Sequence, residues 1–146
     1  MRLGHSITRF IFLIAFTVPF TMSWAQKTDD YSAVKAEKVF NMDFERRYHD
    51  FGKVKRGDKV TTQFSFTNKG TEDIEIELVS ACECTTLDWP RKAVKPGEKA
   101  VIDVVFDSTE KEESETIEID INLKNRDPKT GYPRLEILSY SYELVL

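Results

Sequence analysis

The sequence predicts an all-β protein, a single β-sandwich domain of about seven short strands. Apolar and polar residues alternate with a period of two in several segments, which is typical of strands with one buried face. Glycine, proline, asparagine and aspartate gather between these segments, where a sandwich needs its turns. After residue 25, no segment keeps the apolar spacing of an amphipathic helix. The chain length of 146 residues suits one domain.

The N-terminus has the three parts of a secretory signal peptide. Arg2 and Arg9 give its start a positive charge, and residues 11–20 form an apolar run that is too short to span a bilayer. Ser23 and Ala25 are small residues at the positions that a signal peptidase requires. We therefore expect export with cleavage, in preference to an uncleaved membrane anchor.

Cleavage after Ala25 divides the chain into a signal peptide (residues 1–25), a flexible polar leader (26–36) and a sandwich domain (37–146). The protein is then expected in the periplasm or at the cell surface. The mature chain contains no apolar segment long enough to span a membrane. The net charge of the whole chain is −4, which argues against nonspecific binding to nucleic acid or to anionic membranes.

The first part of the domain is expected to hold one strand and a series of turns. Residues 38–44 alternate through three apolar side chains and predict the first strand. Residues 51–58 are interpreted as turns, because Gly52 and Gly57 lie among charged residues. The triplet Arg56-Gly57-Asp58 is interpreted as an ordinary turn and not as an integrin ligand.

The stretch from Val60 to Leu78 predicts a β-hairpin. Residues 60–66 and 74–78 each alternate strictly, and the segment Asn68-Lys69-Gly70-Thr71 between them has turn chemistry. Both strands are expected to place their apolar side chains on the same face.

The remaining chain predicts three more strands. Residues 85–95 are irregular, and Lys95-Pro96-Gly97-Glu98 is typical of a type II turn, because proline presets φ and glycine permits a positive φ. Strands are expected at residues 100–107, 115–124 and 134–146.

The last of these strands has two expected peculiarities. Its apolar parity changes between Ile137 and Leu138, which predicts a bulge or bend there. Because the sequence stops within this strand, the strand is expected to be an exposed edge that accepts a partner strand.

The mature chain resembles the DUF1573 family of exported bacterial proteins, common in Bacteroidetes, over roughly residues 44–146. The motifs that carry the resemblance are Phe51-Gly52, Phe64-x-Phe66-x-Asn68-x-Gly70, Cys82-x-Cys84-Thr85, Pro96-Gly97-Glu98 and Val104-x-Phe106-Asp107. The resemblance implies an immunoglobulin-like sandwich of the ASPM/SPD-2/Hydin and major-sperm-protein type, and it implies no reaction. The family usually has glycine between the two cysteines, whereas this chain has Glu83.

The two cysteines, Cys82 and Cys84, are the candidate site residues. If the strand that begins at Ile74 continues past Leu78, its parity places both thiols on the core face as small apolar fillers. A disulfide between them is the second interpretation. It requires a local bend, because residues two apart in a strand are separated by about 6.6 Å.

A metal site is the third interpretation of Cys82 and Cys84, since two thiolates on one face suit Cu(I). A closed zinc site has little support, because His49 is the one histidine left after cleavage and zinc normally takes four protein ligands in a structural site. We predict no catalytic residues and no cofactor. His49 is interpreted as a surface residue at the end of a strand.

Asp107-Ser108-Thr109 is similar to a bacterial O-glycosylation sequon and lies in an expected turn, where a glycan has room. The sequence as a whole predicts an exported, non-enzymatic interaction module of the cell envelope with an unknown envelope protein as its partner. The alternative is a thiol-based redox or Cu(I)-binding protein that uses Cys82 and Cys84.

Overall fold

The computed structural model describes residues 37–146, so the predicted signal peptide and leader lie outside the described residues. Within this range the chain forms eight strands and no helix, which confirms the all-β prediction. The strands are β1 (Met42–Phe44), β2 (Tyr48–Lys55), β3 (Lys59–Asn68), β4 (Ile76–Ser80), β5 (Thr85–Asp88), β6 (Lys99–Asp107), β7 (Glu115–Arg126) and β8 (Pro133–Val145). Among residues 37–146 there is no helix with the length and apolar character needed to cross a membrane.

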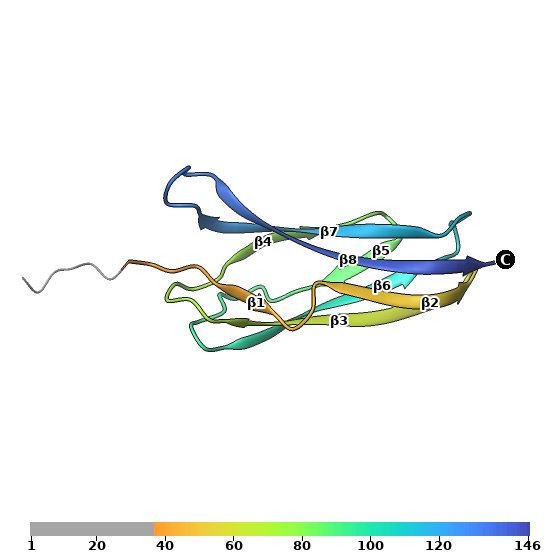
Figure 1. Ribbon diagram of the computed structural model, residues 1–146, viewed down its shortest axis with the longest axis horizontal. Helices are drawn as coiled ribbons and strands as arrows, with labels where there is room; N and C mark the ends of the chain where they lie inside the picture. Colours follow the sequence, from red (N-terminus) through yellow and green to blue (C-terminus); the bar gives the residue numbers. More distant parts are fainter. Residues whose placement is uncertain (1–36) are drawn as a thin grey trace, which may run out of the picture. The chain divides into compact units, whose positions relative to one another are not determined.

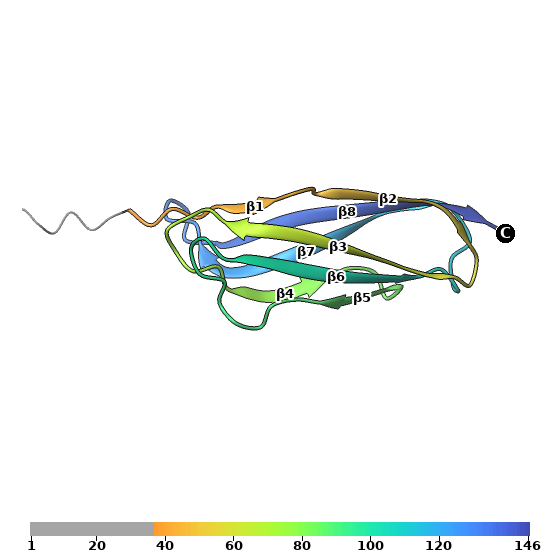
Figure 2. The same cartoon turned by 90° about the horizontal axis from the view of Figure 1, so that it is seen from below.

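Two four-stranded sheets face each other, and together they make the sandwich (Figures 1 and 2). One sheet has the order β1-β3-β6-β5, and we call it the first sheet. The second sheet has the order β2-β8-β7-β4. All neighbouring strands are antiparallel except β2 and β8, which run parallel.

The core lies between the sheets and comes from alternate residues of the long strands. In the first sheet, Phe64 of β3 lies opposite Ile102 of β6. Phe66 of β3 and Phe106 of β6 lie on the same inner face, and all four side chains are fully buried. The second sheet contributes a matching set of buried side chains: Ile119, Ile121, Leu123, Leu138, Tyr140 and Tyr142. The apolar residues of the period-two pattern that predicted these strands point into the core, and the polar residues between them point to solvent.

The predicted hairpin over residues 60–78 is wrong. β3 pairs with β1 and β6 of the first sheet, whereas β4 pairs with β7 of the second. The segment after Asn68 therefore crosses from one sheet to the other. Alternation fixes which face of a strand is buried, and it does not determine the strand with which it pairs.

Two strands occur where turns or irregular chain were expected. β2 includes Gly52, whose φ of 65° accompanies an irregularity in the pairing with β8 between Asp50 and Lys53. β5 lies in the segment 85–95 and pairs with β6. β1 is shorter than the expected strand at residues 38–44.

The prediction that the last strand is an edge is also wrong. β8 lies between β2 and β7, so its backbone is paired on both sides. The expected bulge at Ile137 is absent as well, because the pairing of β8 with β7 is continuous from Leu135 to Tyr142. The apparent change of parity has another cause: Leu135 and Ile137 are apolar residues that point outward, to solvent.

The turn prediction at Lys95–Glu98 is confirmed. Gly97 has a φ of 82°, and the Glu98 amide donates a hydrogen bond of 2.9 Å to the Lys95 carbonyl. The triplet Arg56-Gly57-Asp58 forms the tight connection from β2 to β3, with Gly57 at a φ of 95°. It is the turn that the sequence predicted.

Candidate functional site

The connection from β4 to β5 carries a disulfide bond between Cys82 and Cys84. β4 ends at Ser80, and the Thr85 amide then donates a hydrogen bond of 3.0 Å to the Cys82 carbonyl. This turn brings the two Cα atoms to 5.2 Å, within the range that a disulfide requires. The expectation of two free thiols on a continuing strand is wrong, because the chain leaves the strand before it reaches Cys82.

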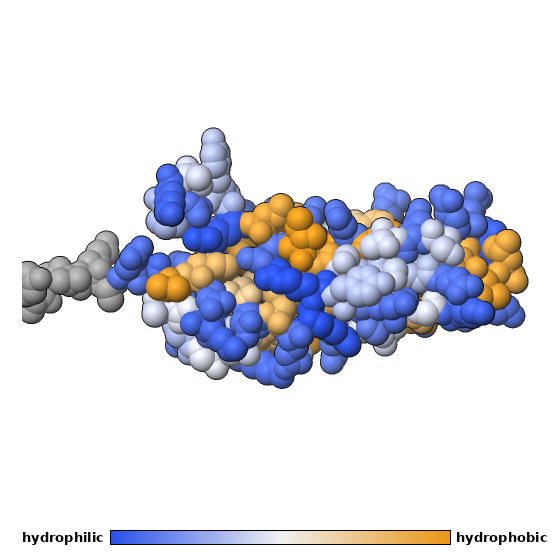
Figure 3. Space-filling view, in the orientation of Figure 1, coloured by the Kyte–Doolittle hydropathy of each residue, from blue (hydrophilic) through white to orange (hydrophobic). Residues whose placement is uncertain are grey.

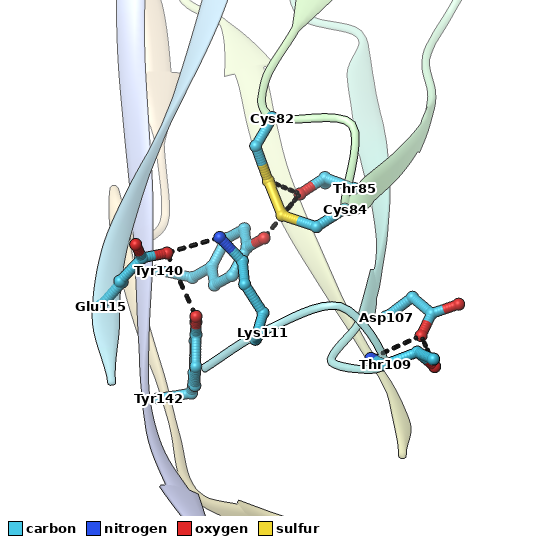
Figure 4. Close-up of a disulfide and its surroundings, with 9 residues drawn as sticks. All are labelled: Cys82, Cys84, Thr85, Asp107, Thr109, Lys111, Glu115, Tyr140 and Tyr142. Carbon is cyan, nitrogen blue, oxygen red and sulfur yellow. Dashed lines mark hydrogen bonds and ion pairs between the residues drawn. A yellow bond between two sulfur atoms is a disulfide. The ribbon is translucent and has the colours of Figure 1, made fainter. Parts of the chain in front are cut away.

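A hydrogen-bonded pair of hydroxyl groups lies next to the disulfide (Figure 4). The Thr85 Oγ1 atom is 3.3 Å from the Cys82 sulfur and 3.7 Å from the Cys84 sulfur. The same oxygen is 2.5 Å from the Tyr140 hydroxyl. Tyr140 is fully buried and comes from β8 of the second sheet, so this contact joins the two sheets directly beneath the disulfide.

A second tyrosine lies nearby and contacts an ion pair. The Tyr142 hydroxyl donates a hydrogen bond of 3.2 Å to Glu115, whose carboxylate also binds the Lys111 ammonium group (Figure 4). The hydrogen bond from Lys111 lowers the pKa of Glu115 below its ordinary value. Burial raises the pKa of Tyr140 and of Tyr142. Both phenols therefore keep their protons at neutral pH and can act as hydrogen-bond donors.

An acidic hollow opens beside the disulfide. It is lined by Glu83, Cys84, Asp107, Thr109 and Glu110. The Asp107 amide donates a hydrogen bond of 2.9 Å to the Cys84 carbonyl, which holds the end of β6 against the start of β5.

The carboxylate of Asp107 is firmly ionised. It accepts hydrogen bonds from the hydroxyl and the backbone amide of Thr109, and it pairs with Lys59 at 3.0 Å. These hydrogen bonds, led by that of the Thr109 hydroxyl, lower the pKa of Asp107 to about 2.

The metal hypothesis stays a prediction for the reduced protein. In the disulfide, neither sulfur is a thiolate, and thiolates are the form that binds metal ions. Among residues 37–146, no group of three or more histidine, cysteine or acidic side chains is arranged to hold a metal ion. His49 does not line the hollow beside Cys84.

His49 lies on β2, with its ring edge-on to Phe51 at a centroid distance of 4.6 Å. Burial and the nearby charge of Arg46 lower its pKa. It borders a groove of mixed polar and apolar lining together with Arg46, Gln63 and Asp103. The groove brings no nucleophilic side chain to the imidazole apart from hydroxyl groups of threonine.

The structure corrects the expectation that a glycan has room at Ser108. This side chain is fully buried, and the carbonyl oxygens of Lys55 and Asp58, at 3.0 and 2.9 Å from its oxygen, share its single hydroxyl hydrogen. The same oxygen accepts a hydrogen bond from the Gly57 amide at 3.1 Å. Ser108 therefore fastens the β2–β3 turn, and a sugar on its oxygen would disrupt all three bonds. Thr109, by contrast, is exposed.

A second candidate surface is the outer face of the second sheet. Leu78 of β4 and the two β8 residues Leu135 and Ile137 are 49%, 52% and 45% exposed there. Asn122 of β7 is the cross-strand neighbour of both Leu78 and Leu135, so the three apolar side chains lie on the same outer face, with Asn122 between β4 and β8. We call these three residues the apolar patch. Figure 3 shows apolar surface over β8 with hydrophilic residues around it.

Sequence reasoning found the cysteines and missed the hydroxyl groups that contact them. Thr85 directly follows Cys84 and was visible as part of a motif, but its role depends on Tyr140, which is 55 positions away. Tyr140 was visible only as one apolar position in an alternating strand. A tyrosine among buried positions is nevertheless a signal, because a buried hydroxyl group needs a hydrogen-bond partner.

Solved structures similar to this chain have the same kind of sandwich. A protein of unknown function from Porphyromonas gingivalis W83 matches with a TM-score of 0.60 and 21% identity, over 79% of this chain and 51% of that protein. The ASH/PapD-like domain 7 of human CEP192 matches with a TM-score of 0.55 and 8% identity, over 73% of this chain and 86% of that domain. These likenesses show an immunoglobulin-like fold, as the sequence resemblance implied.

The Vibrio cholerae VesB protease is also similar, with a TM-score of 0.56 and 11% identity over 70% of this chain. This chain spans about half the length of the Porphyromonas protein and less than a third of the protease. At such identities the likeness concerns the fold alone. No match was found among curated proteins.

The family comparison covers most of the sandwich. Residues 42–132 match the family model described as protein of unknown function (DUF1573). The matched range runs from the start of β1 to the β7–β8 connection, and it includes the disulfide and the two crossings between the sheets on either side of β4. The chain is a member of the DUF1573 family.

Proposed function

We propose that this protein is an exported, non-enzymatic interaction domain of the bacterial cell envelope. The observation that carries the proposal is the apolar patch on the outer face of the second sheet. Three large apolar side chains, each about half exposed, gather on a surface whose other positions are mostly polar. Exposed apolar surface that is bordered by polar residues is a common mark of protein interaction sites.

The composition of the patch suggests the chemistry of the partner. Asp120 of β7 lies opposite Ile137 of β8. Glu118 comes two residues before Asp120 and lies on the same face of β7. Neither carboxylate has an ion-pair partner among residues 37–146. An apolar protein surface bordered by lysine or arginine would complement this arrangement, because it buries the leucines and neutralises the carboxylates.

Export rests on the signal-peptide pattern of residues 1–25. A disulfide in the folded domain supports the same proposal, since disulfides persist mainly in oxidising compartments. Fractionation of the native cell, with Cys82 and Cys84 assayed for free thiols in each fraction, tests this part. Recovery of the reduced protein in the cytoplasm would contradict it.

Site-specific photo-crosslinking in living cells tests the interaction surface. We expect a crosslinking amino acid at position 135 to form adducts with one protein, and the same amino acid at Thr61, on the opposite outer face, to form none. A Leu78→Asp substitution should abolish the adducts at position 135 while circular dichroism and thermal unfolding stay unchanged. Equal crosslinking from positions 61 and 135 would defeat the proposal. Adducts with a second copy of this chain would show that the surface mediates self-association and does not bind another protein.

A second function, thiol–disulfide exchange, is favoured by one specific observation. The Cys82–Cys84 bond is half-buried at the surface, with hydrogen-bonding hydroxyl groups against its sulfur atoms. We expect a dithiol such as dithiothreitol to reduce the folded protein, with a mass increase of about 2 Da and an unchanged circular dichroism spectrum. The reduced form is also the form to titrate with Cu(I) under anaerobic conditions. A bond that resists reduction until the protein unfolds would remove this candidate.

A further inference from the structure

We infer that the Cys82–Cys84 disulfide exchanges at the Cys84 sulfur and that the acidic hollow beside it selects thiols that carry a positive charge. This inference rests on the thiol–disulfide exchange proposed above as the second function. The partner class it identifies is a thiol next to a cationic group, such as a protein cysteine flanked by lysine or arginine.

The position of the hollow decides which sulfur is attacked. Cys84 lines the hollow together with Glu83 and Glu110, whereas Cys82 does not. The Cys82 sulfur lies nearer to the Thr85 hydroxyl, at 3.3 Å against 3.7 Å for the Cys84 sulfur, and this hydroxyl contacts Tyr140. A thiolate that enters the hollow therefore meets the Cys84 sulfur first.

The surroundings of Cys82 suit it to be the leaving group. When the incoming thiolate bonds to the Cys84 sulfur, the bond between the two protein sulfurs breaks and Cys82 leaves as a thiolate. Thr85 can donate a hydrogen bond to this thiolate, and Tyr140 can donate to Thr85 in turn. A hydrogen bond to the charged form stabilises it, which speeds departure.

A second thiol completes the exchange. It attacks the mixed disulfide at the sulfur of the reagent, which releases Cys84 as a thiolate and leaves the two reagent thiols joined as a disulfide. Two electrons pass from the thiol reagent to the protein, and the Cys82 and Cys84 thiolates take up protons from water. The proposal thus requires a thiol reductant and no other co-reactant.

The charges around the hollow decide which thiols enter. Glu83 and Glu110 have no ion-pair partner among the described residues 37–146, and both are exposed. The lysines close to the site are already engaged: Lys59 pairs with Asp107, and Lys111 pairs with Glu115. The Arg56 guanidinium also lies nearby, since it donates a hydrogen bond of 3.2 Å to the Thr109 carbonyl. The three carboxylates that line the hollow still outnumber Lys59 and Arg56. A reagent with a negative group beside its thiol is therefore repelled, and one with an ammonium group is attracted.

The test is a series of thiols that differ in charge: cysteamine (positive), 2-mercaptoethanol (neutral) and mercaptoethanesulfonate (negative). Each reduction rate is divided by the rate of the same thiol with a small neutral disulfide, which removes differences in intrinsic reactivity. At low ionic strength we expect the normalised rate for cysteamine to exceed that for mercaptoethanesulfonate about tenfold. At 0.5 M salt this preference should shrink to less than about twofold.

Two variants make the test specific. Glu83→Gln/Glu110→Gln should lose most of the preference, whereas the control Glu72→Gln/Glu75→Gln, at the opposite end of β4, should retain it. Mass spectrometry of acid-quenched mixed disulfide should find the reagent on Cys84. Reduction with no charge preference, or reagent found on Cys82, would overturn the inference and leave the exchange function standing. Failure of all three thiols to reduce the folded protein would remove the exchange function itself.

Discussion

The chain crosses between the two sheets on each side of β4, and the two crossings are held in different ways. The first crossing, from β3 to β4, is fixed by a buried amide. The second, from β4 to β5, is fixed by a disulfide bond and the hydroxyl groups beneath it. Both are expected to be rigid in the oxidised protein, but only the second contains a bond that a thiol can open.

Asn68 is the residue that holds the first crossing. Its side chain is fully buried, and its amide nitrogen donates to the carbonyl oxygens of Glu72 and Val94 at 2.8 and 2.9 Å. Its amide oxygen accepts a hydrogen bond of 2.9 Å from the Gly70 amide. Gly70 has no room for a side chain, because a Cβ atom would lie 2.1 Å from the Val39 carbonyl oxygen. The first crossing therefore tolerates little change.

The largest loss of stability is expected from a substitution at this first crossing. Replacing Asn68→Ala leaves buried backbone groups without their hydrogen bonds, and we expect the free energy of unfolding to fall by about 3 kcal/mol. Urea unfolding followed by fluorescence measures this loss. Asn122→Ala is the matched control, because Asn122 is half-exposed on the outer sheet face, and its loss should stay below about 0.5 kcal/mol. Equal losses in the two variants would contradict the assignment.

A smaller effect is expected at the second crossing. The disulfide joins residues only two positions apart, so it removes little entropy from the unfolded chain. We expect Cys82→Ser/Cys84→Ser to lower the free energy of unfolding by about 1.5 kcal/mol and to leave the fold intact. Denaturant unfolding of the oxidised protein, the reduced protein and the variant measures this difference. A variant that cannot fold would show that the fold requires the disulfide bond. The expected difference in stability loss between the first and the second crossing would then be wrong.

The smallest expected effect is the pH-dependent contribution of Asp107, which lies next to the second crossing, to the stability of the fold. The pKa of Asp107 is lowered from 3.8 to about 2 in the folded protein, so its contribution to stability is present above pH 4 and is lost as the pH falls from 4 to 2. We expect Asp107→Asn to be slightly less stable than the wild type at pH 6 and to become equal to it only below a pH of about 2, where Asp107 is protonated in the folded protein. Thermal unfolding of both proteins across this range is the measurement. A constant difference in melting temperature at every pH would rule out ionisation as its cause.

The predictability of the fold differs between strands that supply the core and strands that do not. β3, β6 and β7 alternate cleanly because one face of each strand is buried, and all three were predicted from that pattern. β2 and β5 are edge strands with few buried residues, so their alternation is weak and they were interpreted as turns or irregular chain. β8 was recognised as a strand, but its outward-facing Leu135 and Ile137 changed the parity of the apolar residues, which led to the wrong prediction of a bulge.

The candidate site was also predicted only in part from the sequence. The sequence singled out Cys82 and Cys84 as a pair and weighed a disulfide, but strand parity favoured two buried free thiols. That inference failed because it assumed that β4 continues, and a strand continues only as far as it has a partner to pair with. Thr85 joins Tyr140 across the sandwich, a contact for which no local pattern exists.

By itself the sequence determined the all-β class, the buried faces of the main strands, the turn at Gly97 and the family to which the chain belongs. These features depend on alternation and on turn chemistry, which act over a few residues. Only the tertiary structure decided which strands pair, where the chain crosses between sheets, and that the sulfur atoms meet hydroxyl groups from two sheets. Such contacts join residues far apart in the chain, and their free energies depend on the packing of the whole sandwich.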